Sequence, residues 1–469
     1  MSNHTMSIKK QNLPIKVVMF PWLGYGHIMP YLELAKKLTT HGNFKVYMCS
    51  TLATLGCIEH KITDKMAESI SLIPILLPAS PDLPRKLHTT NGLPPSLMPN
   101  LKTALQSSVS VLGFSNILSD LKPDLVIYDF LQPWVPVVAK EMKIQAVQFV
   151  TSSCTSISVM CHYFKNPSGN VKFPFPEIHF RDYESGEMVK MLACSNNPKE
   201  REMVFKGLEE SKNIVLVKGF RDIEHKYIDY ASALLGKRFV AVGPLVQDPS
   251  PDEKYDRESL DLLAWLDKKE PKSTIFVSFG SEYFLTKDDM TEIAHGLELC
   301  GVNFIWVVRF PKDYPNGLNG RLNRNLPEGF VERVGDRGRV LEGWAPQAKI
   351  LGHENTGGFV SHCGWNSVLE SMSLGVPIIA LPMHLDQPIN ARLVGNVGVG
   401  LEVLRDSNGR LHGETLAAVI KKVVVEAAGE SVRKMAAGMK EKLRSKVDEM
   451  DEVIKEIISL CKIKNNGVY

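Results

Sequence analysis

The sequence of 469 residues lacks the features that would place it outside ordinary globular proteins. No apolar run approaches the roughly 20 residues that span a bilayer, and residues 1–16 lack the apolar core of a signal peptide. The formal net charge is only +3, without a strongly basic or acidic block, which makes nucleic acid a poor candidate partner. We therefore expect a cytoplasmic protein with no membrane span and no nucleic-acid partner.

Common cofactor motifs are missing as well. The eight cysteines are scattered without a Cys-x-x-Cys pair, which argues against a disulfide framework or a zinc site. There is no Gly-x-x-x-x-Gly-Lys-Ser/Thr phosphate loop and no Asp-x-Asp triplet to hold a metal. Gly24-x-Gly26 lacks a third glycine, and the strand ending at Ser50 brings no acidic residue for a ribose. A nicotinamide dehydrogenase is disfavoured, and we expect no prosthetic group and no metal.

The chain is long enough for two domains, and its 44% hydrophobic content is typical of a globular protein. In the first half, apolar runs alternate with helical patterns, beginning with a strand at 15–20 and a helix from about Met29. This alternation predicts a doubly wound α/β domain. Further strands are expected at 44–49, 69–75, 124–128, 146–150, 214–217 and 239–242.

A second alternating series follows a segment rich in Pro, Asp and Glu at about 245–259, which predicts an exposed linker. The strands expected beyond it are 274–279, 304–308, 338–341, 357–362 and 376–382, with helices at 287–301, 414–425 and 431–460. We expect two α/β domains that face a cleft, with ligands at the carboxyl ends of the strands. The expected boundaries are 1–244, joined by a C-terminal helix at about 450–469, and 260–449.

The stretch 344–387 contains the strongest candidate for a ligand site. Between its two apolar runs, CGWNSVLESMSLG predicts a sharp glycine turn followed by a helix. The N–H groups and the positive dipole end of a helix N-terminus favour a phosphate. Around this turn lie His362, Trp365, Asn366, Ser367, Glu370, Asp386 and Gln387. The stretch predicts a nucleotide-sugar pocket.

Several of these residues also fit ordinary structural roles. Ser367 with Glu370 matches a helix capping box, and Trp344 could stack on a base, although packing in the core suits a lone tryptophan better. The small residues at 278–281 would let the backbone approach a diphosphate, but a plain turn would look similar. With no metal motif, the helix N-terminus and His362 would have to neutralise a leaving diphosphate.

In the first half, His27 and Asp129 are candidates for acid–base chemistry. His27 follows the first strand, on a turn before the expected helix, and its ordinary pKa near 6.5 suits a general base. Asp129 ends the run PDLVIYD at the edge of another strand, where a carboxylate could hold an imidazole and stabilise the imidazolium. The alternatives are a capping or solvent-facing histidine and a loop carboxylate that binds local amides.

Taken together, these residues resemble a known family. WAPQ, HCGWNS, Glu370, GVP and the terminal DQ of 344–387 closely resemble the signature box of plant family 1 UDP-dependent glycosyltransferases. The motifs PWLGYGHIMP, PDLVIYD and FVSFGS, with the linker position, extend the resemblance over essentially the whole chain. It implies a GT-B fold of two Rossmann-like domains, whose C-terminal helix crosses back onto the first.

The resemblance also implies a role for each site residue. His27 would deprotonate the acceptor hydroxyl with Asp129 as its partner, and displacement at the anomeric carbon would invert its configuration. The implied donor, UDP-glucose, fits a terminal Gln, which goes with this donor more often than with others. The implied donor positions are Trp344 with Gln347 for uracil, Glu370 for ribose, Ser281, His362, Asn366 and Ser367 for the diphosphate, and Trp365, Asp386 and Gln387 for the sugar. Ala345 and Gly364 are further donor-binding positions.

One departure indicates a subgroup. Leu381 stands where the family usually has Trp, and together with HTTNGLPP, SEYF and PMHLDQP it resembles the branch-forming members of plant secondary metabolism. These members add a sugar to the sugar of a flavonoid or terpenoid glycoside. We therefore expect a monomer that takes a small-molecule glycoside and a UDP-sugar, the alternatives being an aglycone acceptor or another donor. Polar groups that could bind a sugar acceptor, unless they are polar only because they are exposed, are Thr89, Thr90, Asn91, Thr151, Ser152, Ser153 and Glu282.

Overall fold

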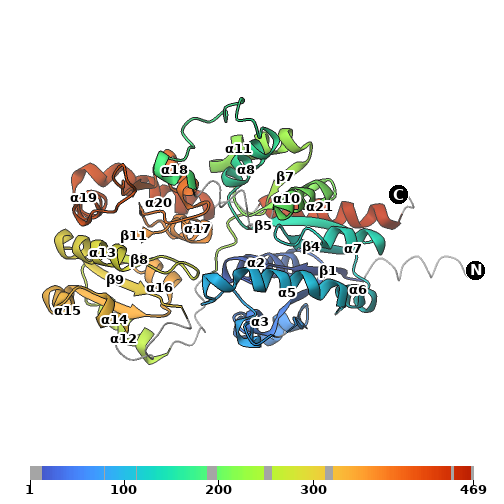
Figure 1. The fold of residues 1–469 in the computed structure, drawn as a ribbon, viewed down its shortest axis with the longest axis horizontal. Coiled ribbons are helices and arrows are strands. Elements are labelled where there is room, and N and C mark those ends of the chain that lie inside the picture. The colour runs from blue at the N-terminus through green and yellow to red at the C-terminus, as the bar shows by residue number, and fades with distance from the viewer. Residues whose placement is uncertain are drawn as a thin grey trace, which may run out of the picture. The chain divides into compact units, whose positions relative to one another are not determined.

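The computed structural model describes residues 13–78, 80–111, 113–186, 198–247, 256–311, 321–444 and 448–465. The chain divides into two compact units, each built around one parallel sheet (Figure 1). The first unit comprises Met1–Cys154, Ala193–Leu245 and Val447–Tyr469, and the second comprises Thr155–Leu192 and Val246–Lys446. Residues 248–255 of the expected linker and 466–469 of the expected C-terminal helix lie outside the described residues.

The first unit contains a seven-stranded sheet in the order β3-β2-β1-β4-β5-β6-β7. Its strands are β1 (Ile15–Phe20), β2 (Phe44–Thr51), β3 (Ile70–Ile75), β4 (Leu125–Asp129), β5 (Gln145–Val150), β6 (Ile214–Val217) and β7 (Arg238–Ala241). Its helices are α2 (Tyr25–His41), α3 (Leu52–Leu55), α4 (Asp64–Ala67), α5 (Met98–Val111), α6 (Phe114–Leu121), α7 (Val135–Glu141), α10 (Pro198–Glu210), α11 (Arg221–Leu235) and α21 (Asp448–Asn465). Helix α8 (Cys154–Lys165) begins at the division between the units.

The second unit contains a six-stranded sheet in the order β10-β9-β8-β11-β12-β13. Its strands are β8 (Thr274–Ser278), β9 (Asn303–Val308), β10 (Gly338–Glu342), β11 (Thr356–Ser361), β12 (Ile378–Ala380) and β13 (Gly400–Glu402). Its other helices are α12 (Arg257–Leu266), α13 (Lys287–Cys300), α14 (Arg321–Asn325), α15 (Phe330–Val334), α16 (Gln347–Gly352), α17 (Trp365–Leu374), α18 (Gln387–Val397), α19 (Gly413–Val424) and α20 (Glu430–Arg444).

These elements confirm the predicted fold class and every predicted strand to within two residues. Strand β13 was missed because three residues are too few to show a pattern. The helical segment expected at 431–460 is two helices, α20 and α21, which belong to different units.

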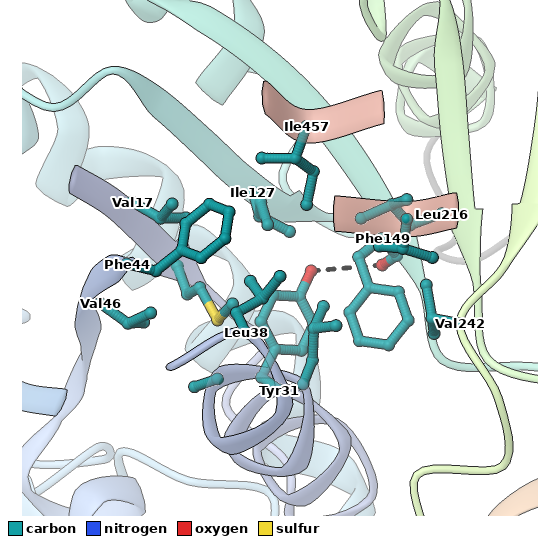
Figure 2. Packing of buried hydrophobic residues seen from close by; sticks show 14 of the residues in the cluster. Val17, Tyr31, Leu38, Phe44, Val46, Ile127, Phe149, Leu216, Val242 and Ile457 are labelled. Atoms are coloured by element: carbon teal, nitrogen blue, oxygen red, sulfur yellow. Dashed lines mark hydrogen bonds between the residues drawn. The ribbon is translucent and has the colours of Figure 1, made fainter. Parts of the chain in front are cut away.

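Both faces of the first sheet lie in apolar clusters. Successive side chains of a strand point to opposite faces, so one strand can contribute to both clusters. In β1, Val17 and Met19 join one apolar cluster, whereas Val18 and Phe20 join another. Figure 2 shows the first of these clusters, in which Ile457 of α21 packs over the same core as α2 and the neighbouring strands. The Tyr31 hydroxyl of α2 donates to the carbonyl of Phe149 at 3.2 Å in this core, so that the buried phenol is satisfied.

The strand orders locate the ligand edge of each sheet. In a doubly wound sheet, successive strands are added first toward one edge and then toward the other. The ligand crevice opens at the point where this order reverses. That reversal lies between β1 and β4 in the first unit and between β8 and β11 in the second, and both pairs are parallel neighbours. In the first pair, His27 lies after β1 and Asp129 is the last residue of β4. In the second pair, residues 278–281 begin at the end of β8, and His362 directly follows β11.

A buried ion network ties the segment after α8 to the second sheet. The Glu402 carboxylate of β13 accepts from Arg181 at 2.5 Å and from Arg392 at 2.6 Å, and Arg392 also binds Glu184. The Arg392 and Glu402 side chains are only 5% and 11% exposed, so their charges depend on one another. The network therefore fixes the 181–184 segment against α18 and β13.

Replacing Glu402 with Gln should destabilise the second unit by about 3–5 kcal/mol, because the buried Arg392 and the partly exposed Arg181 lose their shared carboxylate. Denaturant unfolding would measure the loss. The matched control is Glu298→Gln, which breaks the more exposed pair with Arg333 and should cost about 0–1 kcal/mol. Equal effects of the two substitutions would contradict this reading of the network.

Candidate active site

His27 lies in the first turn of α2, not on a turn before the helix as predicted. The helix begins at Tyr25 after the N-cap Gly24, and His27 N and Ile28 N both donate to the Gly24 carbonyl. The predicted start near Met29 would put Pro30 in the first turn, but Pro30 lies farther inside the helix. At that position it removes one main-chain hydrogen bond and leaves these first bonds intact.

The His27 imidazole is held by a buried carboxylate. Its Nδ1 lies 2.8 Å from Oδ2 of Asp129, which is fully buried, and 3.2 Å from the hydroxyl of Thr151. Gly24, and not His27, is the N-cap residue, and the His27 side chain is 18% exposed and bonded to a buried carboxylate. The structure therefore favours neither the capping nor the solvent-facing alternative. With Nδ1–H donating to Asp129, the lone pair of the neutral ring lies on Nε2, the nitrogen that could accept a proton.

The carboxylate itself is positioned by the loop that follows β4. Asp129 Oδ1 accepts from the main chain of Leu131 at 3.3 Å. Gln132 accepts from Asp129 N at 3.4 Å and donates from Nε2 to the carbonyl of Pro21 at 2.9 Å. Gln132 thus ties the loop after β4 to the loop after β1, which carries His27. Sequence reasoning missed Gln132, since nothing in its local pattern marks a partner more than a hundred residues away.

In the second unit, His362 fills the space between two glycines at the strand ends. A Cβ atom on Gly280 would lie 2.6 Å from its Nε2, and a Cβ on Gly364 would lie 2.5 Å away. Gly280 also has a φ of +79°, which favours glycine. Gly280, which directly precedes Ser281, thus lies against the His362 ring, and so does Gly364, the N-cap of α17.

His362 is a neutral group in this protein. It is 8% exposed, and its Nδ1 has no hydrogen-bond partner among the described residues. Burial, with a smaller contribution from His384, lowers the pKa of His362 to about 3, against a main-chain hydrogen bond with Ser278 that raises it. This lowered pKa favours the neutral imidazole, which can offer a hydrogen bond but no charge. Whether His362 helps to neutralise a bound diphosphate stays a prediction.

The depressed pKa of His362 should make the protein sensitive to acid. In the unfolded chain the His362 imidazole is protonated below about pH 6.5, whereas in the folded chain it is protonated only below about pH 3. The stability contributed by neutral His362 is present above about pH 6.5 and is lost as the pH falls toward 3. In thermal melts, the melting temperature of His362→Gln should fall less between pH 7.5 and pH 5 than that of the parent protein. A substitution of the exposed His41 serves as the control, and identical pH slopes would refute the assignment.

Two structural alternatives for the donor stretch are also wrong. Trp344 is 54% exposed instead of buried, and the Arg309 guanidinium lies 5.3 Å from its ring centre. Ser367 and Glu370 form no capping box, because α17 starts at Trp365 with Gly364 as N-cap and no side-chain cap hydrogen bond. Instead, Gln347 at the start of α16 donates to the Glu370 carboxylate at 2.5 Å.

The N-terminus of α17 presents main-chain groups rather than large side chains. Val368 N makes the helix's first main-chain bond, to the Gly364 carbonyl, so the N–H groups of 365–367 precede the helical ladder. The Trp365 ring is only 4% exposed, Ser367 is 9% exposed, and Ala345 is buried as well. Asn366 is partly exposed. This turn can therefore meet an anion mainly through its backbone.

The last two predicted donor residues stand at the start of α18. Asp386 is its N-cap residue, and its carboxylate accepts from Asn390 at 3.2 Å. Gln387 is buried, and its Oε1 accepts from the main chains of Met383 and His384, each at 3.0 Å. Its Nε2 lies 2.8 Å from Nδ1 of His384. Most of the Gln387 amide therefore shapes its own loop.

Four of the seven residues proposed for a sugar acceptor are buried, so exposure does not explain why those four are polar. Thr89, Thr90, Thr151 and Ser153 are all buried, whereas Glu282 is exposed. The Thr89 hydroxyl donates to the Leu23 carbonyl at 3.1 Å, and Thr90 N donates to the same carbonyl at 2.8 Å. The loop at 88–93 is thus fastened to the segment that leads into α2 and His27. Asn91 and Ser152 are partly exposed.

Comparison with known proteins assigns the family. Residues 257–435 match the sequence profile of the "UDP-glucoronosyl and UDP-glucosyl transferase" family. The chain is 49% identical to a mogroside IIIx synthase of Siraitia grosvenorii, over 98% of this chain and 96% of that protein. It is 48% identical to a β-D-glucosyl crocetin β-1,6-glucosyltransferase of Gardenia jasminoides, over 94% and 98% of the two chains. The crystal structure of Glycyrrhiza uralensis UGT73P12 complexed with glycyrrhetinic acid 3-O-monoglucuronide is similar, with a TM-score of 0.82, 25% identity and 97% of each chain covered.

The chain belongs to the UDP-glucuronosyl and UDP-glucosyl transferase family and has the GT-B fold of its structural relatives. It is a glycosyltransferase that uses a UDP-sugar donor. Among the described residues, no helix is both long enough and apolar enough to cross a membrane.

Proposed function

We propose that this chain is an inverting, UDP-glucose-dependent glucosyltransferase that extends the sugar of a small-molecule glycoside, of the terpenoid or flavonoid class. The observation that carries the proposal is the hydrogen bond of 2.8 Å between His27 and the buried Asp129. A transferase of this kind needs a base for a sugar hydroxyl, and this pair supplies one. The names of two relatives, a mogroside synthase and a glucosyl crocetin glucosyltransferase, support a glycoside acceptor.

In the proposed reaction, Nε2 of His27 removes the proton from the acceptor hydroxyl while the oxygen attacks the anomeric carbon. Asp129 stabilises the imidazolium that forms, as a carboxylate does in a catalytic triad. The bond between the anomeric carbon and the diphosphate oxygen breaks, and its electron pair leaves with UDP. Attack from the face opposite the leaving group turns an α-linked donor into a β-glucoside.

We further propose that residues from about 260 to 449, nearly all of which belong to the second unit, bind the donor, and that residues 1–244 bind the acceptor. The exposed Trp344 would stack on uracil. Gln347 and Glu370, which are hydrogen-bonded to each other, would bind the ribose. The backbone of Ser281 and the α17 turn (364–367) would hold the diphosphate, where developing negative charge meets the positive end of a helix. Asp386 and the remaining N–H of Gln387 would orient the sugar.

Two further proposals concern the state of the protein. We propose a cytoplasmic location, because the cysteines described in the structure are free and most are buried, as expected in a reducing compartment. We also propose that the protein is a monomer. Light scattering on the purified protein tests the monomer, and a fluorescent fusion tests the location. A stable dimer or a secreted product would refute the corresponding part.

The acceptor class is tested by competition between an aglycone and its monoglucoside. With UDP-glucose, we expect the monoglucoside to be converted and the aglycone to remain, and linkage analysis of the product should place the new sugar on the existing one. Exclusive conversion of the aglycone would overturn the branch-forming proposal. Faster turnover with UDP-glucuronic acid or UDP-rhamnose would overturn the donor.

A further inference from the structure

Two strained turns lie directly before the proposed donor residues. Cys363 has a φ of +64° and Leu385 a φ of +55°, whereas residues other than glycine rarely adopt this left-handed conformation. Cys363 precedes Gly364 and the N-terminus of α17, and Leu385 precedes Asp386 at the start of α18. Backbone strain of this kind persists only where surrounding groups hold it.

The turn at Cys363 is held at both of its main-chain polar groups. The hydroxyl of Ser361 accepts from Cys363 N at 3.1 Å. The Cys363 carbonyl accepts from Nδ2 of Asn390 at 3.0 Å. Since φ and ψ of Cys363 set the direction in which the next N–H groups point, these two bonds aim the α17 N-terminus.

Asn390 connects this turn to the second one. It is fully buried, and the same Nδ2 also donates to the Asp386 carboxylate at 3.2 Å. Its Oδ1 accepts from the hydroxyl of Ser156 on α8 at 3.2 Å. The orientation of the amide is therefore defined, with nitrogen toward two acceptors and oxygen toward a donor. An aspartate of the same shape would place an oxygen against the Cys363 carbonyl and the Asp386 carboxylate.

We propose that Asn390 is a positioning residue for the nucleotide-sugar donor, because one amide fixes both the α17 turn and the Asp386 carboxylate. The inference rests on the proposed function, in which the turn holds the diphosphate and Asp386 holds the sugar. Diphosphate and sugar are adjacent parts of one ligand, so the groups that bind them must keep a fixed separation. The Asn390 side chain bonds to both.

The test measures the affinity of Asn390 variants for UDP and for UDP-glucose by calorimetry, and KM and kcat for the donor. Asn390→Ala should weaken binding of both ligands on the order of tenfold to a hundredfold, because misplaced groups bind and orient poorly. Asn390→Asp should be worse. The matched control is Asn355→Ala, which removes another buried amide of the second unit, bonded to the Leu266 carbonyl before β11. That variant should bind UDP like the parent.

A rescue separates positioning from general damage. Glycine adopts the left-handed conformation without strain, so adding Cys363→Gly to Asn390→Ala should restore much of the UDP affinity. It should not restore the extra affinity of UDP-glucose, because Asp386 remains without its partner. If Asn390→Ala fails to fold, Ser156→Ala should show the same pattern more weakly, since it removes only the bond that orients the amide.

The outcomes are distinguishable. A parent protein that binds no UDP overturns the proposed function and, with it, the role of Asn390. The inference alone is overturned if the parent binds UDP and the folded Asn390 and Ser156 variants bind UDP and UDP-glucose as tightly as the parent does. Loss of UDP binding that Cys363→Gly leaves unchanged, or an equal loss in Asn355→Ala, also overturns it.

Discussion

Replacing His27 with alanine should lower kcat by about 10²- to 10⁴-fold, the usual contribution of a general base. UDP affinity should change little, because His27 belongs to the first unit and the proposed donor residues to the second. Steady-state kinetics with a glycoside acceptor and calorimetry with UDP measure the two effects. The control is His41→Ala, which removes the last histidine of the same helix, bonded only locally to the Lys37 carbonyl. Near-normal turnover of the His27 variant would refute its assignment as the base.

Asp129→Asn extends this test to the partner of the base. The amide keeps the shape of the buried carboxylate but cannot stabilise an imidazolium by charge, and its NH₂ group favours the wrong imidazole tautomer. We expect a loss of kcat that approaches that of His27→Ala, and a double variant that is no worse than the single ones, because the two residues act as one device. Additive losses would show that they act separately.

Replacing Gly280 with alanine should weaken UDP binding on the order of tenfold to a hundredfold, because the new Cβ would displace the His362 ring. The Cβ would lie 2.6 Å from Nε2 of a ring that the second glycine, Gly364, confines from its own side. His362 and the Gly280 backbone would both have to move, and with them Ser281 and the turn before α17.

Gly301→Ala is the matched control for this substitution. Gly301 has a φ of +69°, close to the +79° of Gly280, but a Cβ there would meet nothing within 4 Å. The two variants share the strain of a left-handed alanine and should lose similar stability. Only Gly280→Ala should lose UDP affinity, as calorimetry can show. Equal losses of UDP affinity would mean that contact with His362 does not matter.

The sequence predicted the strands and which residues end them, because continuous apolar runs bounded by glycine and proline are local signals. It could not predict that His27 and Asp129 touch, since the neighbour of β1 is set by pairing with β4, about a hundred residues later. His27 and Asp129 could therefore be recognised as candidates from the sequence. Their hydrogen bond of 2.8 Å could be predicted only with knowledge of the strand order in the sheet.

The failures have equally specific causes. The start of α2 was misplaced because Pro30 usually marks a first turn, yet α2 tolerates it farther inside. Trp344 was assigned to the core by its residue type, but it follows β10 in a loop and is 54% exposed. Asn390 and the two glycines beside His362 went unnoticed, because their roles come from contacts between loops that no local pattern reports.

Leu381 illustrates a different limit. It indicated the branch-forming subgroup by resemblance, but its side chain is fully buried in the core of the second unit. It therefore identifies the subgroup by sequence and cannot itself contact an acceptor. The residues that select the acceptor have to be sought among the exposed and partly exposed groups, such as Asn91, Ser152 and Glu282.

The packing of α21 has a consequence for the order in which the protein is completed during synthesis. The apolar cluster of which Figure 2 shows a part includes residues from Val17 to Cys461. The first sheet therefore receives its last apolar cover, from Met450, Val453 and Ile457, only after the second sheet has left the ribosome. Until then, one apolar face of the first sheet lacks part of its cover. A nascent chain stalled near residue 445 should therefore bind chaperones through its first unit, although the residues of the second sheet are already complete.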